Sequence, residues 1–306
     1  MHVKNLAGAS TADQTEFFNS FDRVLSDIDG VLWVGFVPIE DAQSCLENLK
    51  KAGKPVQLVT NYAFTPAVTT HERLIENQFD FELEDIANPQ MATVDYLREA
   101  NFQGKIYAVA SSFYKNELRR EGFEVVEDPP QLIDESLGVL VQNIQDDEDV
   151  RAVVCDFDVN TTFLKIQKAI TYLKRPDCLF ITGGADKFLP VGKIGPLLGN
   201  YFTYQGMTEA TGKKPLSLAK PSKGYMRFVT KKFKVQDPSR VLFIGDMINE
   251  DMGFAAAAGF KKLLVLSGNS SLEDLKNWNH PEEYKPDYYV ESLTELNKII
   301  KTNHKL

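Results

Sequence analysis

The sequence predicts an α/β protein built on a mostly parallel sheet. Short apolar runs alternate with segments of helical periodicity along the whole chain, as expected for successive βα units. The 306 residues, 43% of them hydrophobic and 25% charged, are enough for two domains or one large one with a substantial core.

Composition excludes several classes of protein. The formal net charge of −9 and the absence of Lys/Arg runs argue against nucleic acid as a partner. Cys45, Cys155 and Cys178 form no CxxC pattern, which suits a reducing compartment rather than a disulfide framework. No apolar stretch approaches 18 residues and the N-terminus lacks an apolar signal segment, so we predict a soluble, cytoplasmic protein with no membrane partner.

Ten apolar runs are predicted as strands. They are RVLSDID (23–29), PVQLVT (55–60), KIYAVA (105–110), FEVVE (123–127), LGVLVQ (137–142), RAVVCDF (151–157), CLFIT (178–182), VLFIGD (241–246), KLLVLS (262–267) and PDYYV (286–290).

Helical periodicity lies between these runs. The expected helices are 40–53, 66–77, 89–100, 112–121, 161–173, 222–233, 250–258 and one closing the chain. Gly53 can adopt the left-handed conformation that ends the first of these helices, and Ser222 is suited to cap the start of another. The stretch from 183 to 212 is rich in glycine and predicted to be looser.

Two aspartates end the first predicted strand. Asp27 and Asp29 are one residue apart, so both side chains can point to the same side of an extended segment, just before Gly30. Ligands of open parallel sheets bind beyond the carboxyl ends of the strands, and clustered carboxylates there favour a cation such as Mg²⁺. A turn with solvated aspartates is the alternative.

Three further strand ends or helix starts carry polar residues. Thr60 and Asn61 can donate to phosphate oxygens, although both residue types are also common helix caps. Lys220 is held extended by the following proline and can reach a phosphate, although a surface lysine is the commoner case. Asp246 ends a strand as a metal ligand would, and Asp251 lies in the first turn of a helix, where the helix dipole alone would favour a carboxylate.

Taken in chain order, these motifs resemble the haloacid dehalogenase superfamily over most of the chain. DIDGVLW, LVTN, AKPS and IGDMINEDMGFAAAAGFKKLLVLSG resemble the subgroup of 4-nitrophenyl phosphatases, pyridoxal phosphatase and phosphoglycolate phosphatase. The resemblance implies a Rossmann-like core at 1–102 and 214–306 and an inserted α/β cap domain at 103–213. It also implies a Mg²⁺-dependent phosphatase that acts on a small phosphate ester, and a homodimer formed through the cap.

The resemblance also implies a role for each residue. Asp27 would be the nucleophile that forms an aspartyl-phosphate, and Asp29 the general acid and base. Phosphate would be bound by Gly30, Thr60, Asn61 and Lys220, with Asp186 of the cap as a specificity residue. Magnesium would be held by Asp27, the backbone carbonyl of Asp29, Asp246 and Asp251.

The chain departs from the pattern of the subgroup in two places. Polar residues that usually follow the Thr-Asn pair are replaced by Tyr62, Ala63, Phe64 and Thr65, and the glycine-rich cap segment reads KIGPLLGNYF at 193–202. Other readings therefore stay open. These are a catalytically weak protein that binds a phosphorylated ligand or a protein partner, a receiver-like domain, and a phosphonatase or phosphomutase. The substrate is not identified by the motifs.

Overall fold

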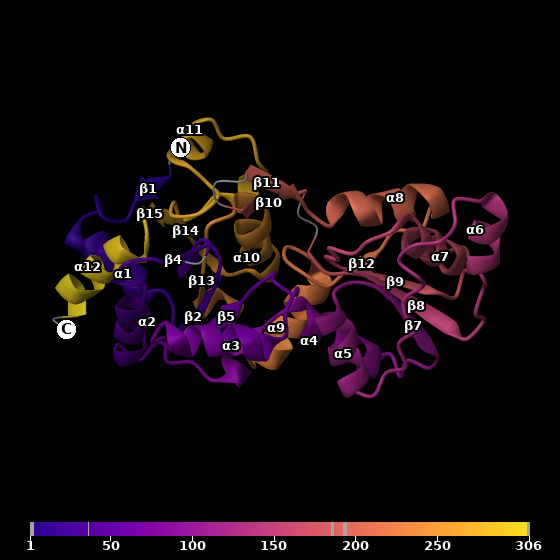
Figure 1. Cartoon of the computed structure of the whole chain (residues 1–306). Helices are drawn as coiled ribbons and strands as arrows, with labels where there is room; N and C mark the ends of the chain where they lie inside the picture. Colours follow the sequence, from indigo (N-terminus) through magenta and orange to yellow (C-terminus); the bar gives the residue numbers. More distant parts are fainter. Residues whose placement is uncertain (1–2, 36, 185–186, 192–194, 305–306) are drawn as a thin grey trace. The chain divides into compact units, whose positions relative to one another are not determined.

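The computed structural model describes residues 3–35, 37–184, 187–191 and 195–304. The chain forms two compact units (Figure 1). Unit 1 comprises Met1–Thr60, Val68–Ala87 and Lys220–Leu306, and unit 2 comprises Asn61–Ala67 and Asn88–Ala219. The sequence-based boundaries fall after 102 and after 213, whereas the main insertion begins after Ala87 and ends at Ala219. That unit 2 acts as a cap stays a prediction.

Unit 1 is built on seven parallel strands in the order β1-β15-β14-β13-β2-β5-β6. Their bounds are β1 (Lys4–Asn5), β2 (Arg23–Ser26), β5 (Val56–Val59), β6 (Ile86–Ala87), β13 (Val241–Gly245), β14 (Lys261–Val265) and β15 (Tyr288–Val290). The chain runs outward from β2 through β5 to β6, and later returns on the other side of β2 with β13. The strand order therefore reverses between β2 and β13, which is where such sheets bind ligands.

Several helices accompany this sheet. They are α1 (Thr11–Asn19), α2 (Ala42–Lys51), α3 (Ala67–Glu76), α9 (Lys223–Lys232), α10 (Gly253–Ala258), α11 (Leu272–Lys276) and α12 (Leu293–His304). Helix α2 buries Cys45, Leu46 and Leu49. The predicted caps are confirmed, because Gly53 has a φ of 78° and the Ser222 hydroxyl accepts a hydrogen bond from the Tyr225 N–H at 3.1 Å.

Shorter elements complete unit 1. They are the two-stranded pair β3 (Trp33–Val34) and β4 (Val37–Pro38), the 3-10 turns at Leu83–Asp85, Pro238–Arg240 and Glu282–Tyr284, and a π-helical turn at Ile248–Met252. The helix predicted at 250–258 therefore begins as a π turn and continues as α10.

Unit 2 contains a second parallel sheet, in the order β12-β9-β8-β7. Its elements are β7 (Lys105–Val109), β8 (Val150–Cys155), β9 (Leu179–Thr182), β12 (Leu216–Ser217), the antiparallel hairpin β10 (Phe188–Val191) and β11 (Gly195–Leu198), and the helices α4 (Pro89–Glu99), α5 (Ser112–Arg120), α6 (Leu137–Asn143), α7 (Phe163–Leu173) and α8 (Tyr201–Thr211). Tyr107, Tyr172 and Phe180 pack in its core. The predicted α/β class is confirmed in both units.

Three predictions about local structure are wrong. LGVLVQ forms helix α6 rather than a strand, because a short apolar run fits either period. FEVVE pairs with β7 only through a bridge between Val125 and Ile106. The stretch from 183 to 212, predicted to be loose, contains the β10–β11 hairpin and α8.

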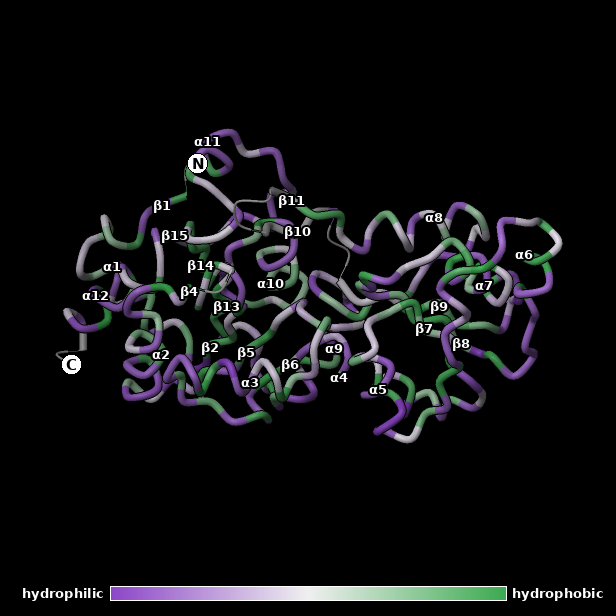
Figure 2. Tube along the Cα trace, in the orientation of Figure 1, coloured by the Kyte–Doolittle hydropathy of each residue, from purple (hydrophilic) through white to green (hydrophobic). Residues whose placement is uncertain are grey.

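The strands of both sheets are mostly hydrophobic, whereas the surface helices alternate in hydropathy (Figure 2). This is the pattern of strands buried on both faces. Within the described part of the chain, no helix combines the length and the apolar character needed to span a bilayer.

Candidate active site

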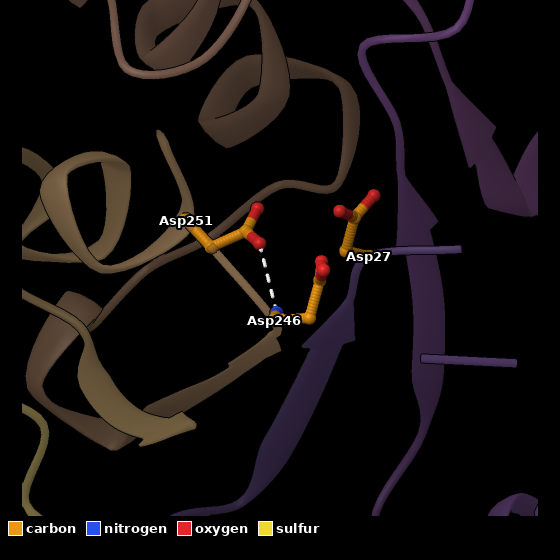
Figure 3. Close-up of side chains that lie close together, drawn as sticks. All are labelled: Asp27, Asp246 and Asp251. Carbon is orange, nitrogen blue, oxygen red and sulfur yellow. Dashed lines mark hydrogen bonds between the residues drawn. The ribbon is translucent and has the colours of Figure 1, made fainter. Parts of the chain in front are cut away.

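Two predicted site residues meet where the strand order of unit 1 reverses. Asp27 follows β2 and Asp246 follows β13, and these strands are neighbours in the sheet. The Asp27 N–H donates to the carbonyl of Ile244 at 2.8 Å, which holds the two strand ends together. Asp251 completes the group, and carboxylate oxygens of all three residues lie within 4.8 Å of one another (Figure 3).

A single lysine links two of these acids. The Lys220 ammonium lies 2.8 Å from Oδ1 of Asp27 and 2.7 Å from Oδ1 of Asp251. Oδ2 of Asp251 accepts hydrogen bonds from the N–H groups of Asp246 and Met247 at 3.0 and 2.9 Å. Both oxygens of Asp251 are thus bound by protein donors, so this side chain fixes the position of the Lys220 ammonium and of the loop after β13.

The charges of the cluster do not cancel. Three carboxylates and one ammonium, all buried, leave two net negative charges. Burial and the neighbouring Asp251 raise the pKa of Asp27 well above its ordinary value, against the opposing effect of Lys220, and they raise the pKa of Asp246 to about 7. Burial alone would lower the pKa of Lys220, but Asp251 and Asp27 raise it overall. A divalent cation would offset the excess charge.

The donor set fits such a cation. Asp246 is fully buried, and its Oδ2 accepts hydrogen bonds from the backbone N–H and the side-chain amide of Asn269 at 2.6 and 2.8 Å. Its Oδ1 has no hydrogen-bond partner among the described residues, which is costly for a buried oxygen. A carboxylate oxygen of this kind is a hard ligand of the type that Mg²⁺ prefers.

Three glycines make room for the carboxylates. A Cβ at Gly30, where φ is +83°, would lie 2.4 Å from Cγ of Asp246. A Cβ at Gly268 would lie 2.0 Å from Oδ2 of Asp246, and one at Gly245 would lie 2.3 Å from Cβ of Asp251. The backbone at Gly30 and at Gly268 therefore approaches Asp246 so closely that neither position has room for a side chain.

Gly268→Ala should weaken binding of a divalent cation at least about tenfold, which corresponds to about 1.4 kcal/mol of binding free energy. The reason is that the added methyl group would displace the Asp246 carboxylate. Titration calorimetry with Mg²⁺ checks this. Gly206→Ala is the matched control, since nothing lies within 4 Å of a Cβ at that position. Equal affinity in Gly268→Ala and the wild-type chain would contradict the assigned position of the cation.

Asp29 points to a different partner. Its Oδ1 accepts a hydrogen bond from Nε1 of Trp33 at 2.8 Å, and its carboxylate is not one of the three that converge. The Gly30 N–H donates to the carbonyl of Trp33 at 2.7 Å, which closes the turn after Asp27. Asp29 is exposed on unit 1 and remains accessible to a ligand, and its predicted metal contact through the backbone carbonyl stays a prediction.

Thr60 is fixed by a buried tyrosine. The Tyr225 hydroxyl of α9 lies 2.9 Å from the carbonyl of Thr60 and 2.8 Å from that of Ala87, while the Thr60 N–H donates to the same Ala87 carbonyl at 3.0 Å. Thr60 and Ala87 are the last residues of unit 1 before the chain enters unit 2. Tyr225 therefore links Thr60 and Ala87, the two residues at which the chain leaves unit 1.

The roles of two other predicted site residues, Asn61 and Asp186, stay predictions. Asn61 is the first residue of unit 2, and Asp186 lies outside the described residues. Sequence reasoning missed Asn269, Gly268 and Tyr225. The first two follow strand β14 in the phrase LSGN, so a polar residue at a further strand end was a usable signal; nothing in the sequence marks Tyr225.

Two family models match the chain. A family model described as haloacid dehalogenase-like hydrolase matches residues 24–124, and a second model of HAD-like hydrolases matches residues 217–296. The two models cover the strand ends that carry Asp27, Lys220 and Asp246.

Relatives match over nearly the whole chain. A 4-nitrophenylphosphatase of Schizosaccharomyces pombe is 30% identical over 294 residues, covering 94% of this chain and 97% of that protein. The chloroplastic phosphoglycolate phosphatase 1A of Arabidopsis thaliana is 29% identical over 292 residues, covering 93% of this chain and 78% of that protein. A solved structure of a hypothetical protein from Pyrococcus horikoshii has a TM-score of 0.76 and 27% identity, over 91% of this chain and 99% of that one.

Fold and site thus define a hydrolase of the α/β structural class, with a parallel-sheet core and a buried acidic cluster suited to a divalent metal. The chain belongs to the haloacid dehalogenase-like hydrolases. The resemblance to the 4-nitrophenyl phosphatase and phosphoglycolate phosphatase subgroup is confirmed.

Proposed function

We propose that the chain is a Mg²⁺-dependent phosphatase that hydrolyses a small-molecule phosphate monoester through a phosphorylated Asp27. The convergence of Asp27, Asp246, Asp251 and Lys220 at the reversal of strand order supports this proposal most strongly. The matched relatives named as phosphatases support it independently.

The first half-reaction transfers the phosphoryl group to the protein. Oδ1 of Asp27 is held by the Ile28 N–H and by Lys220, which leaves Oδ2 to attack phosphorus. A bond forms between Oδ2 and phosphorus while the bond from phosphorus to the ester oxygen breaks. Asp29, in its protonated form, gives its proton to the departing ester oxygen, which leaves as an alcohol.

The second half-reaction restores the protein. Asp29, now ionised, takes a proton from a water molecule whose oxygen attacks phosphorus. The bond between phosphorus and Oδ2 of Asp27 breaks, and inorganic phosphate leaves. Lys220 offsets negative charge next to Asp27 in both steps, as phosphoryl transfer requires.

Magnesium completes the proposed site. Oδ1 of Asp246 and a carboxylate oxygen of Asp27 would hold the ion, and Asp251 would support them through Lys220 and the loop after β13. When bound, Mg²⁺ neutralises phosphate charge and orients the phosphoryl group. Thr60, Asn61 and the backbone near Gly30 are proposed to bind phosphoryl oxygens, and Asp186 to contribute to specificity.

Hydrolysis of 4-nitrophenyl phosphate tests the proposal. Release of 4-nitrophenol should require Mg²⁺, should stop with excess EDTA, and should return when Mg²⁺ is restored. A panel of phosphoglycolate, pyridoxal phosphate, glycerol phosphate, nucleotides and sugar phosphates at equal concentration would then rank the substrates. No turnover of any ester near neutral pH would refute the proposed activity and favour a phosphate-binding protein.

Tyr225→Phe should lower kcat about tenfold with a smaller change in KM, because the lost hydroxyl frees the Thr60 and Ala87 carbonyls it bridges. Steady-state kinetics on the best ester of the panel checks this. Tyr114→Phe is the matched control, since it removes an equally buried hydroxyl bonded to Thr93. Equal kcat losses in both variants would show that Tyr225 has only a structural role.

The proposal also includes a cytoplasmic homodimer that associates through unit 2. The three buried cysteines are unpaired, as in a reducing compartment. Unit 2 exposes large apolar side chains on and near α6, with Leu137 81% and Val141 68% accessible. We expect Leu137→Ser combined with Val141→Ser to convert a dimer to a monomer in analytical ultracentrifugation, whereas Val37→Ser in unit 1 should not. A wild-type monomer would exclude this part of the proposal.

A further inference from the structure

Unit 2 contains a group of buried charges that the proposed reaction does not use. Lys115 of α5 and Lys165 of α7 are 4% and 2% exposed, which is rare for lysine. The Lys115 ammonium lies 2.5 Å from Oδ1 of Asp128, and that of Lys165 lies 3.1 Å from Oδ2 of Asp128 and 2.9 Å from Asp158. The four side chains form a chain of alternating charge.

These side chains line a cavity of about 260 Å³ that lies entirely within unit 2. Its wall is both polar and apolar: Ser112, Gln131 and Asn160 contribute polar side chains, and Phe64 and Phe113 contribute aromatic surface. The cavity is therefore suited to a small molecule with one charged end and one apolar end.

The two lysines have hydrogen-bonding capacity to spare. An ammonium group has three donors, yet Lys115 donates one hydrogen bond and Lys165 donates to two carboxylates among the described residues. Buried donors without acceptors are costly, so these ammonium groups favour an acceptor-rich group in the cavity. The Ser111 hydroxyl already donates to the carbonyl of Phe64, and among the described residues the polar side chains of Ser112, Gln131 and Asn160 accept no hydrogen bond from either lysine.

Asp128 differs from the other three charged residues. Its side chain is 40% accessible, whereas that of Asp158 is 4% accessible. It bridges both lysines from the loop before α6, and can turn to solvent at less cost than a buried carboxylate. A ligand anion that took its place would still leave both lysine ammonium groups next to a negative charge.

We propose that this cavity binds a small oxyanion, a carboxylate or a phosphate, whose charged group replaces Asp128 between Lys115 and Lys165. Asp128 is then an internal counter-ion that competes with the ligand. If the four charged residues were purely structural, removal of the Asp128 carboxylate would not increase the affinity for any anion. The site is independent of the catalytic proposal, since none of its residues belongs to the acidic cluster of unit 1.

Titration calorimetry of the full chain with inorganic phosphate and with benzoate tests the proposal. Asp128→Asn should bind at least one of these probes about tenfold or more tightly than wild type, because the competing carboxylate is gone. Lys115→Met should abolish that binding. Lys105→Met is the matched control, since it removes a lysine of β7 that pairs with Asp147 and Asp149 outside the cavity.

Each outcome decides. Tighter binding by Asp128→Asn supports the site even if Lys115→Met fails to fold, and benzoate or phosphate as the preferred probe identifies the charged group. Inorganic phosphate can also bind at the catalytic site proposed for unit 1, so the deciding quantity is the gain in affinity of Asp128→Asn over wild type. No gain for either probe, or a gain that persists when Lys115→Met is added to Asp128→Asn, would overturn the proposal.

Discussion

Asp27→Asn should reduce kcat for 4-nitrophenyl phosphate at least roughly 10³-fold. An amide is a poor nucleophile, and neither other carboxylate of the cluster is expected to replace Asp27: both oxygens of Asp251 are bound by protein donors, and Asp246 is proposed to hold the cation. The fold should be retained. Burial and Asp251 raise the pKa of Asp27, so a neutral side chain of the same shape relieves repulsion, and Tm should be unchanged or higher.

Asp80→Asn provides the control for this substitution, because its side chain lies in unit 1 and is 85% exposed. Stopped-flow and steady-state assays on both variants separate loss of chemistry from loss of substrate binding. Retention of a near wild-type kcat by Asp27→Asn would rule out Asp27 as the nucleophile, whatever the effect on KM.

Lys220→Met should destabilise the metal-free protein by about 3–5 kcal/mol, because it leaves Asp27 and Asp251 buried without their cation. It should also reduce kcat strongly, since the charge next to the nucleophile is lost. Chemical denaturation and thermal scans measure the first effect. Mg²⁺ should recover more stability in this variant than in wild type, because the cation then offsets three unpaired carboxylates.

Lys105→Met is the comparison for stability, since that ammonium forms ion pairs with Asp147 and Asp149 but is 25% accessible. Because these ion pairs are partly solvated, the Tm of this variant should change little. Similar destabilisation by the two substitutions would show that the buried position of Lys220 confers no special energetic role.

The sequence was most informative at the ends of parallel strands. Asp27 and Asp246 were predicted because polar residues directly after apolar runs gather at one edge of a parallel sheet. Lys220 was predicted from the extended conformation that the following proline imposes, and Asp251 from its place in the first turn of a helix. The reversal of strand order between β2 and β13 could not be predicted from these runs, because it depends on which strands pair.

The errors have physical causes as well. LGVLVQ was misassigned because a short, mostly apolar run satisfies both periods, and the outcome depends on whether a neighbouring strand is available to pair with it. Nor did the sequence reveal that the lack of a side chain at Gly30 makes space for Asp246. Close approach of backbone to a distant side chain leaves no local pattern. Tyr225 was missed for the same reason, since its partners are more than 130 residues away.

Mass spectrometry of acid-quenched protein tests the central claim most directly. The full chain is mixed with Mg²⁺ and 4-nitrophenyl phosphate, quenched during turnover and digested with trypsin, which releases residues 24–50 as one peptide. We predict that this peptide carries one phosphoryl group, located on Asp27, and that the group is absent when Mg²⁺ is omitted. Turnover without phosphorylation of this peptide at any quench time, or a phosphoryl group on another residue, would contradict the account.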